Sequence, residues 1–106
     1  MKFSVSLAAA ALLALSATAA NAANHMVEQK GAAFAPGTMS VKLNDTVVFV
    51  NNDKVTHNVY SRSSGNEFRV SAQKPGEKTA IKFDNKGEID VRCAMHPKMR
   101  LTINVE

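Results

Sequence analysis

Apolar and polar side chains alternate along several short segments of the sequence. The clearest lie at residues 39–43, 79–83, 89–93 and 101–105, while 46–50 is a continuous apolar run and 55–60 is a further strand candidate. Successive side chains of a β-strand point to opposite faces, so alternation predicts half-buried strands and a continuous run predicts a buried one. Turn-forming Asn, Asp, Gly and Pro residues separate these segments. The pattern therefore predicts an all-β fold, an antiparallel sandwich or barrel.

The first 22 residues follow a different pattern. Lys2 precedes an apolar stretch of alanine and leucine from Leu7 to Leu15, and Ala20-Asn21-Ala22 then supplies an A-x-A cleavage site. These are features of a secretory signal peptide, and the apolar stretch is short for a membrane span. We therefore expect a signal peptide at residues 1–22, a mature domain at 23–106, export and no membrane anchor.

The length, charge and cysteine content of the chain limit which classes of function are possible. A chain of 106 residues allows one domain at most. The net charge of +4 comes without a basic run, which argues against nucleic acid as a partner. Small exported domains usually have paired cysteines, but Cys93 is the one cysteine of the sequence. Cys93 is therefore a buried small hydrophobe, an intermolecular link, or a reactive or metal-bound thiol.

Thiol, imidazole and thioether groups recur every three residues at Cys93, His96 and Met99. A chance stripe on a helix is opposed by Pro97, because proline inside a helix removes a donor and clashes with the preceding turn. A short loop between two strands can instead curl so that the three side chains face inward, and His57 on another strand can add a fourth donor. Two imidazoles, one thiolate and a weak axial methionine are typical of a type 1 copper site.

Two other chemistries use a Cys–His pair. Zinc accepts cysteine and histidine equally well, but it rarely recruits a thioether such as that of Met99. A Cys–His hydrolase is the other candidate, although a small sandwich with a methionine in the loop offers no obvious substrate cleft. The residue pattern therefore favours copper.

At these residues the chain resembles the cupredoxins, in particular the small plastocyanin, pseudoazurin and amicyanin group. The resemblance covers Phe34-Ala35-Pro36, the segment from Val41 to Asp53, His57-Asn58-Val59 and the C-x-x-H-x-x-M loop of residues 93–99, whose tight spacing is like that of amicyanin. It implies a Greek-key β-sandwich with one copper and periplasmic one-electron transfer. By the same resemblance the copper ligands are His57, Cys93, His96 and Met99, and Asn58 braces the ligand loop by hydrogen bonding.

The resemblance also implies how the protein works. The edge of His96 reaches the surface and passes electrons, and Ala94, Met95, Pro97 and Pro36 form a small apolar docking patch around it. We expect a monomeric, non-enzymatic carrier that binds a redox partner protein transiently. Lys98 and Arg100 bias docking toward acidic partners.

Two departures from the family pattern support an alternative function. Thr56 stands where the family often has proline, and Ala94-Met95 replaces the usual Thr-Pro or Ser-Pro beside the metal. Periplasmic cupredoxins associated with copper tolerance look similar and carry extra His and Met residues. His25, Met26 and Met95 are such residues, so the alternative is a copper-handling protein that binds or oxidises Cu(I) and holds a second copper site.

His25 has a further possible role at the new N-terminus. Cleavage after Ala22 makes His25 the third residue, where the amino group, two backbone amides and the imidazole can enclose Cu(II) in a square plane of nitrogens. The opposing interpretation is that His25 simply begins the first strand.

Overall fold

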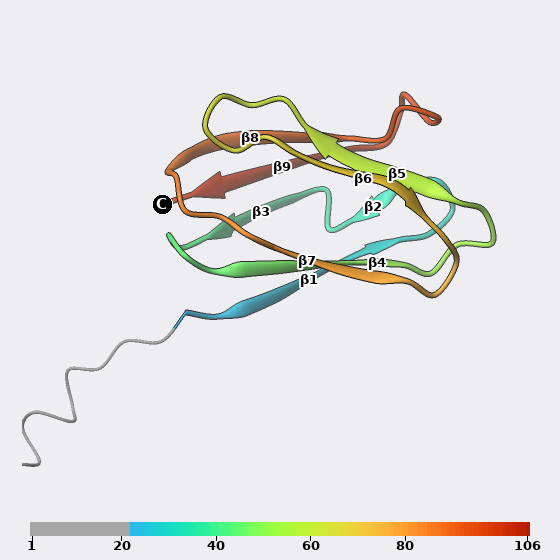
Figure 1. Cartoon of the computed structure of the whole chain (residues 1–106), viewed down its shortest axis with the longest axis horizontal. Coiled ribbons are helices and arrows are strands. Elements are labelled where there is room, and N and C mark those ends of the chain that lie inside the picture. Colours follow the sequence, from blue (N-terminus) through green and yellow to red (C-terminus); the bar gives the residue numbers. More distant parts are fainter. Residues whose placement is uncertain (1–21) are drawn as a thin grey trace, which may run out of the picture.

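Two β-sheets packed face to face make up the part of the chain that the computed structural model describes, residues 22–106 (Figure 1). A four-stranded sheet has the order β2-β1-β4-β7, and a five-stranded sheet has the order β3-β9-β8-β5-β6. The strands are β1 (Asn24–Gln29), β2 (Phe34–Ala35), β3 (Thr38–Val41), β4 (Thr46–Asn51), β5 (His57–Ser61), β6 (Phe68–Gln73), β7 (Lys78–Lys82), β8 (Gly87–Arg92) and β9 (Arg100–Val105). The all-β prediction is confirmed. The expected signal peptide, except for Ala22, lies outside the described residues.

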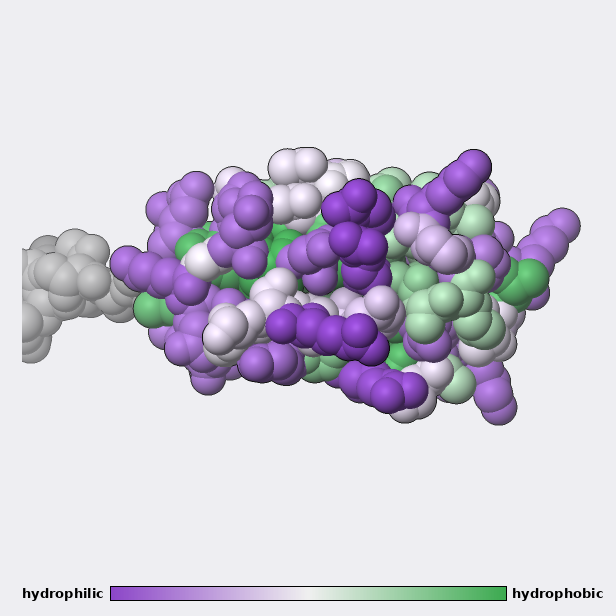
Figure 2. Space-filling view, turned by 90° about the horizontal axis from the view of Figure 1, so that it is seen from above, coloured by the Kyte–Doolittle hydropathy of each residue, from purple (hydrophilic) through white to green (hydrophobic). Residues whose placement is uncertain are grey.

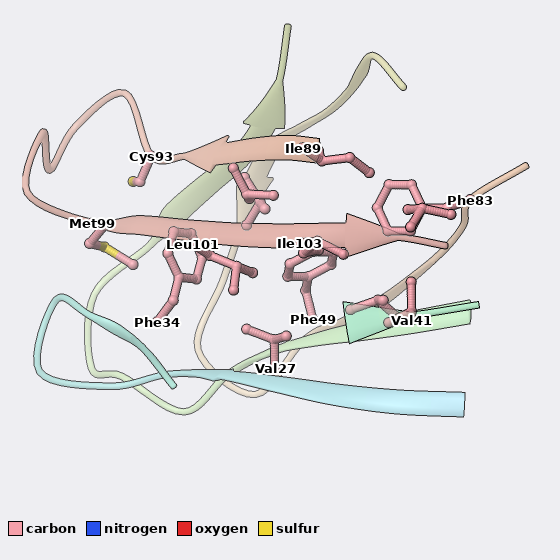
Figure 3. Close-up of a cluster of buried hydrophobic side chains, with 14 residues drawn as sticks. Val27, Phe34, Val41, Phe49, Phe83, Ile89, Cys93, Met99, Leu101 and Ile103 are labelled. Carbon is pink, nitrogen blue, oxygen red and sulfur yellow. The ribbon is translucent and has the colours of Figure 1, made fainter. Parts of the chain in front are cut away.

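The core fills the space between the two sheets. Alternating residues of 89–93 and 101–105 point inward, as the sequence pattern predicted (Figure 3). The apolar run 46–50 was predicted to be buried, and in it Val47, Phe49 and Val50 are buried while Thr46 and Val48 are half-buried. The four-stranded sheet contributes Val27, Val47 and Phe49, and the five-stranded sheet contributes Val59, Ile89, Val91, Leu101 and Ile103, all of them fully buried. Burial of this apolar surface is the main favourable contribution to folding.

Two strand pairs differ from the antiparallel prediction. β1 pairs with β4 in parallel, and β3 pairs with β9 in parallel, while the other pairs are antiparallel. The chain leaves the first sheet after β2, adds β3 to the second sheet, and returns as β4. Such a crossover allows β4 to run beside β1 in the same direction, which a tight hairpin cannot do.

Three strands were not predicted from the alternation of apolar and polar residues, although β1 confirms the interpretation that His25 lies at the start of the first strand. In β1 the two inward positions are occupied by Val27 and the polar Gln29, so the apolar alternation is hidden. β2 has only two residues. In β6 the alternation stops after Val70, where the pairing with β5 shifts register between His57 and Val59.

The strand directions decide which residues meet at each end of the sandwich. β5 begins at His57 and pairs antiparallel with β8, which ends just before Cys93, so the start of β5 lies beside the loop of residues 93–99. The first residues of β1 pair with the start of β4 at the opposite end (Figure 1). Within residues 22–106 no helix has the length and hydrophobicity to cross a membrane.

Candidate metal centre

The loop between β8 and β9 is closed by two consecutive turns. The His96 N–H donates to the Cys93 carbonyl at 3.3 Å, and the Met99 N–H donates to the His96 carbonyl at 2.9 Å. Each turn advances three residues, so the loop brings the side chains of residues 93, 96 and 99 round to the same end of the core. Pro97 occupies a position whose nitrogen needs no hydrogen bond, which is compatible with this curl.

Three donor atoms converge at this end. The Cys93 Sγ lies 3.9 Å from the His57 Nδ1 and 3.8 Å from the His96 Nδ1, and the two Nδ1 atoms are 3.2 Å apart. All three atoms lie within 4.8 Å of one another. His57 and Cys93 are buried and His96 is half-buried. This is the one such grouping of three metal-binding side chains among the described residues.

Asp53 orients the buried imidazole of His57. The His57 Nε2 lies 2.9 Å from the Asp53 Oδ2, and the Ala32 N–H donates to the same carboxylate oxygen at 2.9 Å. These two bonds, that of Ala32 first, lower the pKa of Asp53 well below its usual range. An ionised carboxylate can only accept, so Nε2 carries the proton and Nδ1 presents a lone pair toward Cys93.

Asp53 is the site residue that sequence reasoning missed. Its signal was an acidic residue four positions before His57, across the Asn51-Asn52-Asp53 turn. Metal-binding histidines commonly donate their other ring N–H to a carboxylate, so this spacing was readable in principle.

Asn58 joins β5 to the ligand loop. Its Oδ1 accepts the Ala94 N–H at 2.7 Å, which links the residue after His57 to the residue after Cys93. The bond fixes the distance between the two segments that hold the donor atoms.

Met99 lies in the core beneath the loop. It is fully buried, as is Cys93 apart from 2% of its surface. Figure 3 shows their two sulfur-bearing side chains at the same end of the core, beyond Leu101 and Phe34. Met95 differs, because 53% of its surface is exposed.

Comparison with known proteins identifies the family. The model for copper-binding proteins of the plastocyanin/azurin family matches residues 20–106. The chain belongs to this family. A comparison with curated protein sequences gave no match. The cupredoxin assignment made from the motifs is therefore confirmed.

Solved structures show the same fold. An amicyanin variant in its reduced Cu(I) form is 26% identical to this cupredoxin, with a TM-score of 0.72 over 85% of this chain and 88% of that one. A purple cupredoxin from Nitrosopumilus maritimus is 19% identical, with a TM-score of 0.69 over 77% and 99% of the two chains. A copper-containing nitrite reductase from Thermus scotoductus is 26% identical, with a TM-score of 0.73 over 78% of this cupredoxin but 22% of the reductase.

The residues present fit the metal of the family, which is copper. The candidate set of His57, Cys93, His96 and Met99 combines a thiolate, two imidazoles and a thioether, a set suited to copper in both of its common oxidation states. The lone pair of the His57 Nδ1 is left free by the bond to Asp53, and it points toward the sulfur of Cys93. The donor set therefore favours copper over zinc, which rarely uses methionine.

The residues named for a second copper site do not come together. Met95 is in the ligand loop, whereas His25 and Met26 lie in β1 near the start of β4, at the other end of the sandwich (Figure 1). The His25 Nε2 lies 2.8 Å from the Asp45 Oδ2, and the Ala23 N–H donates to the Asp45 Oδ1 at 2.8 Å. Asp45 thus holds both Ala23 and His25 at the start of β1.

Proposed function

We propose that this cupredoxin is an exported one-electron carrier with a type 1 copper site. His57, Cys93, His96 and Met99 would hold the metal. The observation that carries the proposal is the convergence of the Sγ and two Nδ1 atoms within 4.8 Å at one end of a cupredoxin sandwich. The chemistry that copper supplies when bound is one-electron exchange between Cu(I) and Cu(II).

The protein holds the donor atoms in place in advance. His57 is fixed by Asp53, and the loop is fixed by Asn58 and by its two turns. Donors that scarcely move when the oxidation state changes keep the reorganisation small, which favours fast electron exchange. The burial of Cys93 and Met99 keeps water from the sulfur atoms.

His96 connects the site to the surface. It is the half-buried member of the donor group, and the exposed side chains of Ala94, Met95 and Pro97 surround it in the sequence. A small apolar patch of this kind suits a brief encounter with a redox partner protein, since such interfaces are small and weak.

We propose a carrier and not an enzyme. The similarity to the nitrite reductase covers 22% of that enzyme, so it concerns one part of a larger protein. We further propose that residues 1–22 are a signal peptide and that the mature domain, residues 23–106, acts in the periplasm. The charged Lys2, the apolar stretch and the A-x-A site support this proposal.

Replacing the thiolate tests the site. The mature protein loaded with Cu(II) should bind one copper and show an intense visible thiolate-to-copper band. Cys93→Ser should remove that band, because a hydroxyl is a much poorer donor to copper than a thiolate. Met95→Leu is the matched control in the same loop and should keep the band. A serine variant that retains the band would place the copper elsewhere.

A second candidate function is copper handling in the periplasm. The observation that favours it is the thioether of Met95, which is 53% exposed beside the candidate ligands and is available to Cu(I) from solution. This function predicts more than one copper per chain and copper sensitivity on gene deletion. Normal copper resistance with a defect in one redox pathway would favour the electron carrier.

A further inference from the structure

All four arginines of the chain lie on one side of the molecule. They are Arg62, Arg69, Arg92 and Arg100, and three of them are in strands of the five-stranded sheet. Each alternates with an inward-facing neighbour, such as Val91 before Arg92 and Leu101 after Arg100, so each points out from the core. We call these four residues with Tyr60 the arginine face.

The strand register aligns most of this face in one row. Arg69 of β6 pairs with Tyr60 of β5, Tyr60 pairs with Arg92 of β8, and Arg92 pairs with Arg100 of β9. Directly paired residues project from the same side of a sheet. The row crosses four strands and so spans about 14 Å, because neighbouring strands lie roughly 4.8 Å apart.

Arg62 packs over the ring of Tyr60, which belongs to the row. Its guanidinium carbon lies 5.2 Å from the centre of the Tyr60 ring. Attraction between a cation and the face of an aromatic ring holds such a pair together. The tyrosine therefore has arginines on several sides, and none of them is drawn into the core.

Negative charge offsets the arginine face only in part, through Asp90 and through Glu67 in the adjoining hollow. Asp90 pairs with Arg92, with an Oδ2 to Nη2 distance of 2.9 Å, and both Arg92 and Arg100 act to lower the pKa of Asp90. Among residues 22–106, Arg62, Arg69 and Arg100 form no ion pair. Figure 2, seen from the side of this sheet, shows the most hydrophilic side chains gathered across the middle of the face, and paler apolar surface toward one end.

A hollow of about 390 Å³ joins the arginine face to the metal centre. Its lining includes Tyr60, Arg62, Arg69, Asn58 and Ala94. The carboxylate of Glu67 also lines it and forms no ion pair with these arginines. Asn58 follows the candidate ligand His57, and Ala94 follows the candidate ligand Cys93. A group bound in this hollow therefore lies one residue from two of the candidate ligands.

We propose that the arginine face is the docking surface for an acidic redox protein, one of whose carboxylate side chains enters the hollow beside Asn58 and Ala94. The proposal rests on the proposed electron-carrier function and names the kind of partner. Guanidinium groups bind carboxylates through two parallel hydrogen bonds, and arginine and tyrosine are the side chains enriched at protein interfaces. Docking here would bring the partner to the side of the ligand loop as well as to His96.

A protein fits this surface better than a lipid membrane does. The hollow is lined by Tyr60 and Arg69 of the row, so a side chain that projects from a partner can enter it and reach them, whereas a flat layer of headgroups meets only the outer surface. A field of one sign next to the metal centre also steers an acidic protein into a productive orientation.

A titration with an acidic peptide tests the binding part. Octaglutamate added to the ¹⁵N-labelled mature protein at low salt should shift the amide signals of Tyr60, Arg69, Arg92 and Ala94, and salt should reverse the shifts. Arg69→Glu with Arg100→Glu should abolish them. Lys78→Glu with Lys82→Glu on β7 of the other sheet changes the net charge equally and should leave them intact. Equal loss in both double variants would overturn the proposal.

A double variant that removes the two charges without reversing them distinguishes a loss of binding from a loss of folding. Arg69→Gln with Arg100→Gln should weaken octaglutamate binding while the unfolding temperature stays that of the wild type. Vesicles of phosphatidylglycerol supply the competing source of negative charge. Vesicle binding that depends on Arg69 and Arg100, with no octaglutamate binding, would overturn the acidic-protein assignment.

Oxidation by two reagents of opposite charge tests the redox part. In the copper-loaded protein, the charge-reversed arginine pair should slow oxidation by hexacyanoferrate(III) by about tenfold or more, and should not slow oxidation by tris(phenanthroline)cobalt(III). The β7 lysine pair should slow the hexacyanoferrate reaction much less. Equal slowing by both pairs would overturn the docking site. Octaglutamate binding with copper that no reagent can oxidise or reduce would refute the carrier function, and leave the acidic docking face standing.

Discussion

Met99 combines two roles that a single substitution can separate. It is fully buried in the core and is also a candidate copper ligand. Met99→Leu keeps the volume, so the cost in unfolding free energy should stay under about 1.5 kcal/mol. Loss of the thioether disfavours Cu(II), so copper should remain bound while the reduction potential rises. Voltammetry and the visible spectrum measure this, and a variant unchanged in both would show that Met99 only packs.

Asp53 acts on the site through His57. Its carboxylate accepts the Nε2–H of that imidazole at 2.9 Å, so it fixes the ring and makes the Nδ1 a better donor. Asp53→Asn should weaken copper binding by about 10- to 100-fold and raise the reduction potential. Competition with a chelator and potentiometry are the measurements.

Asp84 provides the control for this effect, because its carboxylate lies in an exposed loop and contacts the neighbouring Asn85. Asp84→Asn removes the same charge without touching an imidazole. If both variants lose copper affinity to the same extent, the effect is one of net charge and not of the bond to His57.

At the scale of elements, Asn58 connects β5 to the loop between β8 and β9. Removing its side chain frees the Ala94 N–H, which is exposed enough to bind water. Asn58→Ala should therefore cost only about 0.5–1.5 kcal/mol of stability. The ligand loop should nevertheless loosen, so copper should leave faster when a chelator is added. Asn52→Ala, which breaks a surface bond to Glu28, should leave the rate of copper loss unchanged.

Strands whose inward side chains are all apolar were predictable from the sequence. The segments at 46–50, 89–93 and 101–105 alternate or run apolar, and each is a strand of the core. For β1 only the start was predicted, in the interpretation that His25 begins the first strand, because the buried Gln29 interrupts the apolar alternation and bonds to Gln73 of the other sheet. The parallel pairing of β1 with β4 depends on contacts far apart in the sequence, which a local pattern does not contain.

Three of the candidate ligands were predictable because they lie close together in the sequence. Cys93, His96 and Met99 lie within one segment of seven residues, so their spacing alone indicates a common metal centre. Asp53 was missed because its role depends on the turn that folds it back onto His57. The arginine row was missed because it needs the register of four strands, which the sequence does not reveal.

At the scale of the whole molecule, the two ends of the sandwich differ in chemistry. One end carries the donor group of His57, Cys93 and His96. The other carries the carboxylate of Asp45, which accepts hydrogen bonds from the Ala23 and Lys42 amides and contacts His25. The pKa of Asp45 falls from 3.8 to about 2. The hydrogen bond from Ala23 contributes most to this shift, and the hydrogen bond with His25 contributes the next largest part.

This carboxylate makes stability depend on pH in a predictable direction. The pKa of Asp45 is lower in the folded chain, so its contribution is complete above its ordinary pKa of 3.8 and is lost as the pH falls through about 2. Asp45→Asn should therefore lower the unfolding temperature at pH 6, and the difference from wild type should shrink as the pH falls toward 2. Calorimetry across this range measures it. A difference that stays constant with pH would show that Asp45 contributes packing alone.

The hydrogen bond from Ala23 to Asp45 bears on where the proposed signal peptide is cleaved. Removal of residues 1–22 would turn the Ala23 amide into an ammonium group 2.8 Å from a nearly buried carboxylate, so proteolysis would create an ion pair that the precursor lacks. A cut one residue earlier or later would place the new charge out of register with Asp45. If cleavage occurs after Ala22, as proposed, the folded domain would gain this ion pair on processing.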